Sequence, residues 1–239
     1  MLLDAKEHDF RLLNEKIREA QEDCHIVGCC GERFIAAGMK DRRITIDGVP
    51  GNALGAYLNG AEITVNANAQ DAVGDTMNDG KIVIHGSVGD AAGYAMRGGK
   101  IYVRNNAGYR AGIHMKEYHE KVPVMIIGGR CGSFLGEYQA GGIIIVLGLE
   151  TGGKKTVGNF PCTGMHGGKV YLRGDCEGIR LPAQVSSRKA TEADMSEIET
   201  YLDEYCGIFG LDRNMIKSQQ YTVITPDSSN PYKQLYVAN

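Results

Sequence analysis

Histidines and cysteines give this 239-residue sequence its widest chemical scope, because both types bind metals and serve in acid–base or nucleophilic reactions. Three of the seven cysteines lie close together, at Cys24, Cys29 and Cys30. Such a cluster could hold a metal ion or an iron–sulfur cluster, but its spacing matches no standard ligand pattern. Since the cysteine count is odd and no C-x-x-C pair occurs, the simpler interpretation is a set of buried thiols.

A second candidate is the stretch GIHMKEYHEK at residues 112–121. His114 and His119, together with Glu117 and Glu120, could form a metal site or an acid–base site. The alternative is an exposed loop that contacts a partner. We favour that alternative, because insertions in repeat proteins usually map to binding surfaces.

Glycine-rich loops could also hold a phosphate, and glycine is abundant here, with 33 residues. The run GDAAGYAMRGGKIYVRNNAGYRAG at residues 89–112 is the clearest case. Its spacing is not G-x-G-x-x-G, no Lys-Ser/Thr pair follows, and no long helix offers its N-terminus. No G-x-S-x-G elbow occurs either, and His166 is interpreted as a packing residue in a tight turn. We therefore assign no catalytic, cofactor-binding or metal residue.

The elements that would position these residues follow a repeat. Short aliphatic triplets recur along the chain, and most neighbouring triplets begin 19 residues apart. Two gaps are longer, by insertions of 5 and 7 residues. The triplets begin at Ile44, Ile63, Ile82, Ile101, Met125, Ile144 and Val170.

Glycines keep phase with these triplets, at 4, 7 and 11 residues after the first aliphatic. We predict that they are structural, because glycine suits corners with positive φ and close backbone approach. These structural glycines are Gly48, Gly51, Gly55, Gly86, Gly89, Gly93, Gly108, Gly112, Gly129, Gly132 and Gly136.

A period near 20 with short strands is typical of a β-solenoid, in which each coil stacks on the previous one. A left-handed hexapeptide helix is the competitor, but the expected aliphatic at every sixth position fails at Lys100. The predicted fold class is therefore all-β, a single-stranded right-handed parallel β-helix with helical caps.

Segments at both ends could supply those caps. Residues 5–22 form an amphipathic pattern, with Phe10, Leu13 and Ile17 on one face and Leu12 beside it. Near the C-terminus, Thr191 is a predicted N-cap and Gly207 a predicted helix end, with a strand at 221–225. Tyr232 and Tyr236 could anchor a tail on the body or on a partner. We predict a cap at 1–25, a β-helix at 26–180, and a helix and extended tail at 181–239.

Charge excludes some partners. The net charge is −3 and no basic block occurs, so neither nucleic acid nor an anionic membrane is an expected partner. No signal peptide and no apolar run of membrane-spanning length are visible, so we expect a cytoplasmic protein.

The ordered motifs resemble the GXGXG domain of the glutamate synthase large (alpha) subunit. The resemblance is carried by four stretches and by the C-terminal SSNPYKQLY. The stretches are GVPGNALGAYLNG (48–60), NAQDAVGDTMNDGKIVIHG (68–86), GGRCGSFLGEYQAGGIIIVLG (128–148) and GMHGGKVYLRGD (164–175). The corresponding subunit of formylmethanofuran dehydrogenase is similar to the same domain and is an alternative.

The resemblance implies a β-helix without catalytic residues of its own. It also implies a scaffold role in glutamate biosynthesis, between a glutaminase that releases ammonia and an FMN and iron–sulfur synthase that aminates 2-oxoglutarate. FMN and the cluster are expected on a partner chain, and none in this one. The rival interpretations are a regulatory solenoid of amidotransferases and an enzyme that uses the 113–121 loop.

This chain departs from the full glutamate synthase protein. It begins Met-Leu-Leu and therefore has no cysteine nucleophile at position 2, and it shows neither a barrel pattern nor a cysteine triplet. We therefore expect a free-standing chain with separate glutaminase-type and FMN/iron–sulfur partner chains, and a homo-oligomer stays open. The predicted partner surface comprises Arg97, Arg104, Arg110, Lys116, Glu117, Tyr118 and His119.

Overall fold

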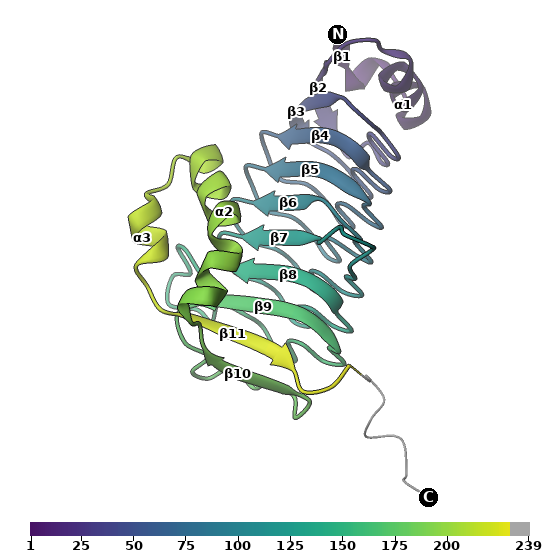
Figure 1. Cartoon of the computed structure of the whole chain (residues 1–239). Helices are drawn as coiled ribbons and strands as arrows, with labels where there is room; N and C mark the ends of the chain where they lie inside the picture. The colour runs from purple at the N-terminus through teal and green to yellow at the C-terminus, as the bar shows by residue number, and fades with distance from the viewer. Residues whose placement is uncertain (230–239) are drawn as a thin grey trace, which may run out of the picture.

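The computed structural model describes residues 1–229 and shows a right-handed β-solenoid (Figure 1). Its 11 strands form one sheet in the order β1 to β9, then β11 and β10. Strands β1–β9 pair in parallel, whereas β11 is antiparallel to both β9 and β10. The strands are β1 (Leu2–Asp4), β2 (Cys24–Cys30), β3 (Arg43–Val49), β4 (Asn59–Val65), β5 (Asp79–Ile84), β6 (Lys100–Val103), β7 (Val124–Ile127), β8 (Ala140–Val146), β9 (Gly167–Arg173), β10 (Val185–Lys189) and β11 (Tyr221–Pro226). The helices are a 3-10 turn (Ala5–Glu7), α1 (Phe10–Glu19), α2 (Glu192–Phe209) and α3 (Arg213–Lys217).

The predicted triplets are the strands of the stack, and their register is confirmed. Ile44 pairs with Ile63, and each later anchor pairs with the next, as far as Ile144 with Val170. The two insertions leave this register unchanged, because the extra residues lie outside the strands. A further strand precedes the predicted first anchor, since Cys24 in β2 pairs with Ile44.

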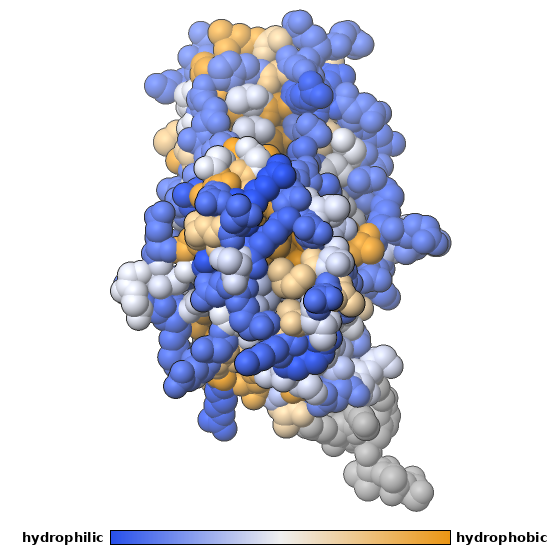
Figure 2. Space-filling model, turned by 60° about the vertical axis from the view of Figure 1, so that its left-hand side comes forward, coloured by the Kyte–Doolittle hydropathy of each residue, from blue (hydrophilic) through white to orange (hydrophobic). Residues whose placement is uncertain are grey.

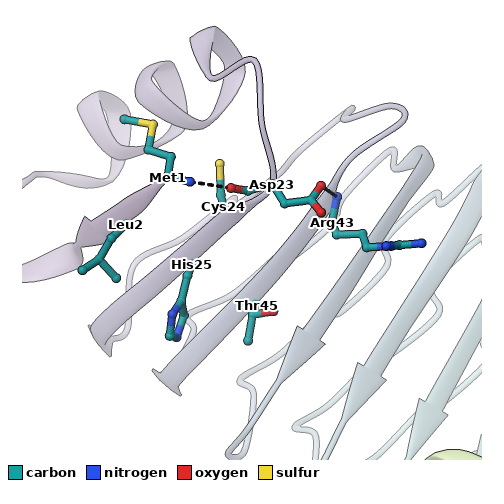
Figure 3. A pocket seen from close by; sticks show the side chains of 7 residues that line it. All are labelled: Met1, Leu2, Asp23, Cys24, His25, Arg43 and Thr45. Atoms are coloured by element: carbon teal, nitrogen blue, oxygen red, sulfur yellow. Dashed lines mark hydrogen bonds between the residues drawn. The ribbon is translucent and has the colours of Figure 1, made fainter.

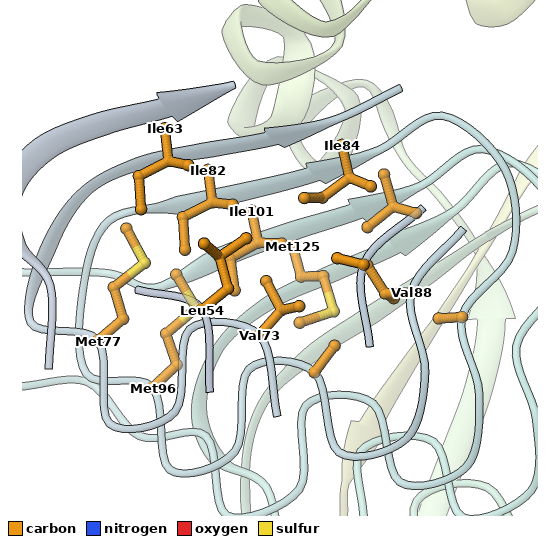
Figure 4. Packing of buried hydrophobic residues seen from close by; sticks show 14 of the residues in the cluster. Leu54, Ile63, Val73, Met77, Ile82, Ile84, Val88, Met96, Ile101 and Met125 are labelled. Atoms are coloured by element: carbon orange, nitrogen blue, oxygen red, sulfur yellow. The ribbon is translucent and has the colours of Figure 1, made fainter. Parts of the chain in front are cut away.

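Stacked columns of buried side chains fill the coils (Figure 4). The anchors Ile63, Ile82, Ile101 and Met125 face a second column of methionine and leucine from the opposite wall. That second column comprises Met39, Leu58, Met77, Met96 and Met115. One coil places buried Gln139 in the same position, where its side-chain amide nitrogen donates to the carbonyls of Gly141 and Gly142.

The corner before each strand alternates left-handed residues with ordinary ones. In one coil, Ala91, Gly93 and Ala95 have φ of 56°, 69° and 49°. The amides of Ala91 and Ala95 donate to the next coil, at 2.7 and 2.8 Å, whereas that of Gly93 donates to Val73 of the previous coil at 2.7 Å. The corner is therefore tied to both neighbouring coils.

The eleven predicted structural glycines occupy two kinds of position. Gly48, with φ of 112°, also lies so close to β2 that an added Cβ would be 2.2 Å from the carbonyl oxygen of Cys29. The others with positive φ are Gly55, Gly93, Gly112 and Gly136. For the remaining six, an added Cβ would lie under 3.0 Å from an atom of a neighbouring coil; these are Gly51, Gly86, Gly89, Gly108, Gly129 and Gly132.

The first coil is covered by α1, which is shorter than the predicted helix. The side chain of Asp9 caps it by accepting from the amides of Arg11 and Leu12, and Leu13 and Ile17 are buried. Asn14 is buried on the same helix. Residues 5–7 form a separate 3-10 turn.

The last coil is extended by β11 and β10, while α2 lies across the outer face of the sheet (Figure 1). Ile198, Leu202 and Tyr205 of α2 are buried in a cluster with outward-facing residues of β5–β9. Thr191 and Asp194 form a capping box, as the sequence predicts for Thr191. The predicted end at Gly207 is wrong, because the helix continues to Phe209 and ends at left-handed Gly210.

The strand predicted at 221–225 is β11, and the division at residues 25 and 180 stays a prediction. The predicted anchors Tyr232 and Tyr236 lie outside the described residues. Among residues 1–229, none of the helices has the length and apolarity that a membrane crossing requires.

Candidate docking surface

The seven residues of the predicted partner surface do not form one cluster. Arg97 precedes β6 and Arg104 follows it, so the two lie at opposite ends of that strand. Lys116 lies one coil further than Arg97, since its amide donates to the carbonyl of Met96 at 3.0 Å. Arg104 instead lies 3.8 Å from a carboxylate oxygen of Glu150.

The insertion that carries Tyr118 and His119 is bound to its own coils. Glu117 accepts from the amide of Gly142 at 2.9 Å, and Lys121 forms an ion pair with Asp79 at 2.7 Å. The rings of Tyr118 and His119 are in edge contact, with centroids 4.2 Å apart. Glu117 is thus already engaged in positioning the loop.

The structure separates the proposed metal ligands. His114 stacks on Tyr138, whereas His119 contacts Tyr118. No group of three or more His, Cys, Asp or Glu residues within the described part of the chain could hold a metal ion, which applies to this loop and to the three N-terminal cysteines alike.

The cysteines of the solenoid are buried thiols rather than nucleophiles. Burial raises the pKa of Cys162 to about 12, and it raises the pKa of Cys131 still further. Burial, together with the carboxylate of Glu32 that accepts from its thiol at 3.1 Å, raises the pKa of Cys29 to about 12. These thiols therefore stay protonated near neutral pH.

A shallow depression of about 480 Å³ lies beside the first strands (Figure 3). Asp23, His25 and Arg43 line it, but each polar group already has a partner. Asp23 accepts from the amide of Arg43 at 3.0 Å, and His25 lies 2.6 Å from Asp47. The depression therefore offers no unpaired acid or base.

The outer face of strands β5–β9 is occupied by α2. Glu204 of α2 binds Lys100 and the hydroxyl of Tyr102, at 2.6 and 2.9 Å, and Glu197 binds the equivalent pair Lys169 and Tyr171. Burial opposes the charged form of Glu204, but the bonds from Lys100 and Tyr102 outweigh it and lower the pKa of the carboxyl. The side that carries α2 and α3 is mostly hydrophilic, with only small separate hydrophobic groups (Figure 2).

The most unusual exposed surface lies on the corners of the later coils. We call it the corner ridge, and define it as Arg110, His114, Phe134, Tyr138 and Phe160. All five residues are left-handed, with φ between 52° and 64°. In earlier coils the positions equivalent to Arg110 and Phe134 hold Ala53, Ala72 and Ala91.

Ring and charge contacts join the ridge residues of neighbouring coils. The guanidinium of Arg110 lies 5.0 Å from the ring centre of Phe134, which stacks on Phe160 at 5.3 Å. Beside this column, His114 stacks on Tyr138 at 5.3 Å. Arg110 also forms an ion pair with Glu137 at 3.0 Å.

Bulky residues in the left-handed region each cost on the order of 1 kcal/mol, so their exposure on the ridge calls for a compensating role. Phe160 is 57 % exposed. Exposed aromatic and arginine side chains of this kind are typical of protein interfaces.

The sequence identifies Arg110 as a surface candidate but misses Phe134, Tyr138 and Phe160. A positional signal could have found two of them. Phe134 and Tyr138 lie two residues before and two residues after Gly136, as Arg110 and His114 do around Gly112.

Comparison with known proteins agrees with this architecture. The GXGXG motif family model matches residues 22–226. The chain is also 43 % identical over 250 residues to "Uncharacterized protein MJ1350" of Methanocaldococcus jannaschii, covering 99 % of this chain and 96 % of that protein. The chain therefore belongs to the GXGXG motif family, the family of the glutamate synthase alpha-subunit domain that its repeat resembles.

Proposed function

We propose that this protein is a non-catalytic scaffold subunit of a glutamate synthase-like complex. It holds a glutaminase-type chain, which releases ammonia, and an FMN and iron–sulfur chain at a fixed separation. The observation that carries the proposal is the corner ridge on a solenoid of the GXGXG family: an exposed, strained row of aromatic and cationic side chains suited to protein contact.

The stacked coils suit such a role mechanically. Parallel pairing joins each strand from β1 to β9 to the next, so the two ends of the stack are connected by a continuous hydrogen-bonded sheet. A solenoid of this kind offers elongated side surfaces on which two partners can bind side by side. Glutamine hydrolysis and amination of 2-oxoglutarate are then tasks of the partners, and the cofactors FMN and iron–sulfur cluster lie on one of them.

Co-expression tests this proposal. The full chain is produced with a candidate glutaminase chain and a candidate FMN-barrel chain, and the assembly is isolated through a tag on this chain. We expect both enzymes to co-elute, and glutamate formation from glutamine and 2-oxoglutarate to increase when this chain is present.

Three results would contradict the scaffold role. They are failure of the chain to join either enzyme, turnover or bound flavin in the isolated chain, and exclusive association with formylmethanofuran dehydrogenase chains. The last result would favour the alternative role, as a scaffold of that dehydrogenase.

A further inference from the structure

The two ends of the solenoid are closed differently at the corner. Within the stack, the outer left-handed amides of each corner donate to carbonyls of the next coil. Arg110 donates to Ser133 and Phe134 to Asn159, both at 2.9 Å, and Tyr138 donates to Thr163 at 2.8 Å. Each corner thus needs a following segment with two carbonyl acceptors.

The last corner lacks that segment. Phe160 and Gly164 occupy the same two positions, but neither amide has a hydrogen-bond partner among residues 1–229. The neighbouring sheet edge is closed, because β11 pairs with β9. The gap is therefore confined to the corner below the ridge.

At the other end, one side chain closes the corner of the first coil. Asn14 of α1 accepts from the amide of Ala36 at 3.0 Å and donates to the carbonyl of Arg33 at 3.3 Å. Since these groups are taken, a second copy cannot stack its first coil on the open last corner.

The side chain at the open corner extends the same pattern. Phe160 stacks on Phe134 on one side, and Arg110 lies over Phe134 in turn. The Phe160 ring ends this series and is 57 % exposed. An aromatic or guanidinium group is the complement that would continue the series.

We infer that the last corner, at Phe160 and Gly164, is a docking site for a polypeptide segment of a different protein chain. The segment supplies two backbone carbonyls to the free amides and places an aromatic or arginine side chain on Phe160. This inference rests on the proposed function, in which that chain is one of the two enzyme partners.

Amide hydrogen exchange measured by NMR on the full chain tests the backbone part. In the isolated chain, the amides of Phe160 and Gly164 exchange fast, while those of Phe134 and Tyr138, one coil earlier, are protected and serve as internal controls. Adding the bound partner slows exchange at Phe160 and Gly164. Protection in the isolated monomer would assign the corner to the chain's own residues, and protection that grows with chain concentration would assign it to a second copy; either result overturns the inference.

A glycine substitution tests the side-chain part. Phe160→Gly relieves the left-handed backbone and so does not impair folding, but it removes the ring. Phe34→Gly is the matched control, since Phe34 is also left-handed and exposed but lies in the first coil. We expect Phe160→Gly to weaken partner binding about tenfold or more and Phe34→Gly to leave it within about twofold.

The outcomes separate the two proposals. If neither enzyme chain binds the unchanged protein, the proposed function fails and this inference fails with it. If a partner binds the unchanged protein and the Phe160→Gly variant equally well, the scaffold role stands and the docking site at the last corner is wrong.

Discussion

At Gly48, backbone conformation and crowding act together. Its φ is 112°, and an added Cβ would lie 2.2 Å from a backbone oxygen of the neighbouring strand. We predict that Gly48→Ala lowers the free energy of unfolding by at least about 2 kcal/mol, since neither the φ nor the backbone contact can relax cheaply. Urea unfolding measures the loss.

Gly207 is the matched control for that change. It lies inside α2, has no left-handed φ, and an added Cβ would meet nothing within 4 Å. Gly207→Ala should raise the free energy of unfolding by about 0.5–1 kcal/mol, because alanine favours helix. Equal losses from both substitutions would contradict the structural role of Gly48.

Thiol reactivity should separate the seven cysteines by burial. Cys30 is exposed, whereas Cys29, Cys131 and Cys162 are buried with raised pKa values. In the native protein at pH 8, a disulfide reagent such as DTNB should modify Cys30 rapidly and these three only after denaturation. Cys30→Ser should abolish the fast phase, and fast labelling that survives this substitution would refute the assignment.

At the scale of elements, α2 is held by charge pairs as well as by apolar contact. We predict that Glu204→Gln lowers the free energy of unfolding by about 1 kcal/mol at pH 7, because Glu204 is partly exposed and solvent screens the pair. Glu199→Gln is the control; Glu199 is 56 % exposed and should change stability by less than about 0.5 kcal/mol.

The Glu204 effect should depend on pH with a defined sign. The folded protein lowers the pKa of this carboxyl below its ordinary value of 4.5. Its stabilisation is therefore complete above pH 4.5 and is lost as pH falls through the lowered value. Unfolding curves of the two proteins at pH 7 and pH 3 should converge at the acidic pH, and a constant difference would exclude an ionic contribution.

The same elements show what the sequence could predict. The strands follow from local repetition, because each anchor from Ile44 to Val170 recurs with its glycines in phase. The position of α2 depends on Glu204 meeting Lys100, more than 100 residues away, and no local pattern records such a meeting.

Two further features escape the sequence for physical reasons. The end of α2 lies beyond the predicted Gly207 because packing of Phe209 against Tyr205 and His85 carries the helix further. The ridge is not predicted because aromatic residues rarely adopt left-handed φ, so nothing in their propensity places Phe134 or Phe160 at a corner.

For the whole molecule, the solenoid should be unevenly stable along its axis. Repeat folds gain stability from neighbouring units, and α2 adds a second layer over β5–β9 only. We predict that the amides of β6–β8 exchange more slowly than those of β3 and β4 under native conditions. Uniform protection along the stack would mean that α2 contributes little to local stability.

The unbroken register of the anchors sets a rule for changing the size of the protein. Removing residues 63–81, one full period, would join Glu62 to Ile82 and leave every inward-facing side chain in a matching column. Such a deletion would shorten the molecule by one strand spacing, about 4.8 Å, whereas removing a single residue would turn apolar side chains outward. The length of this protein is thus quantised, and a lineage could adjust it only in whole steps of the repeat.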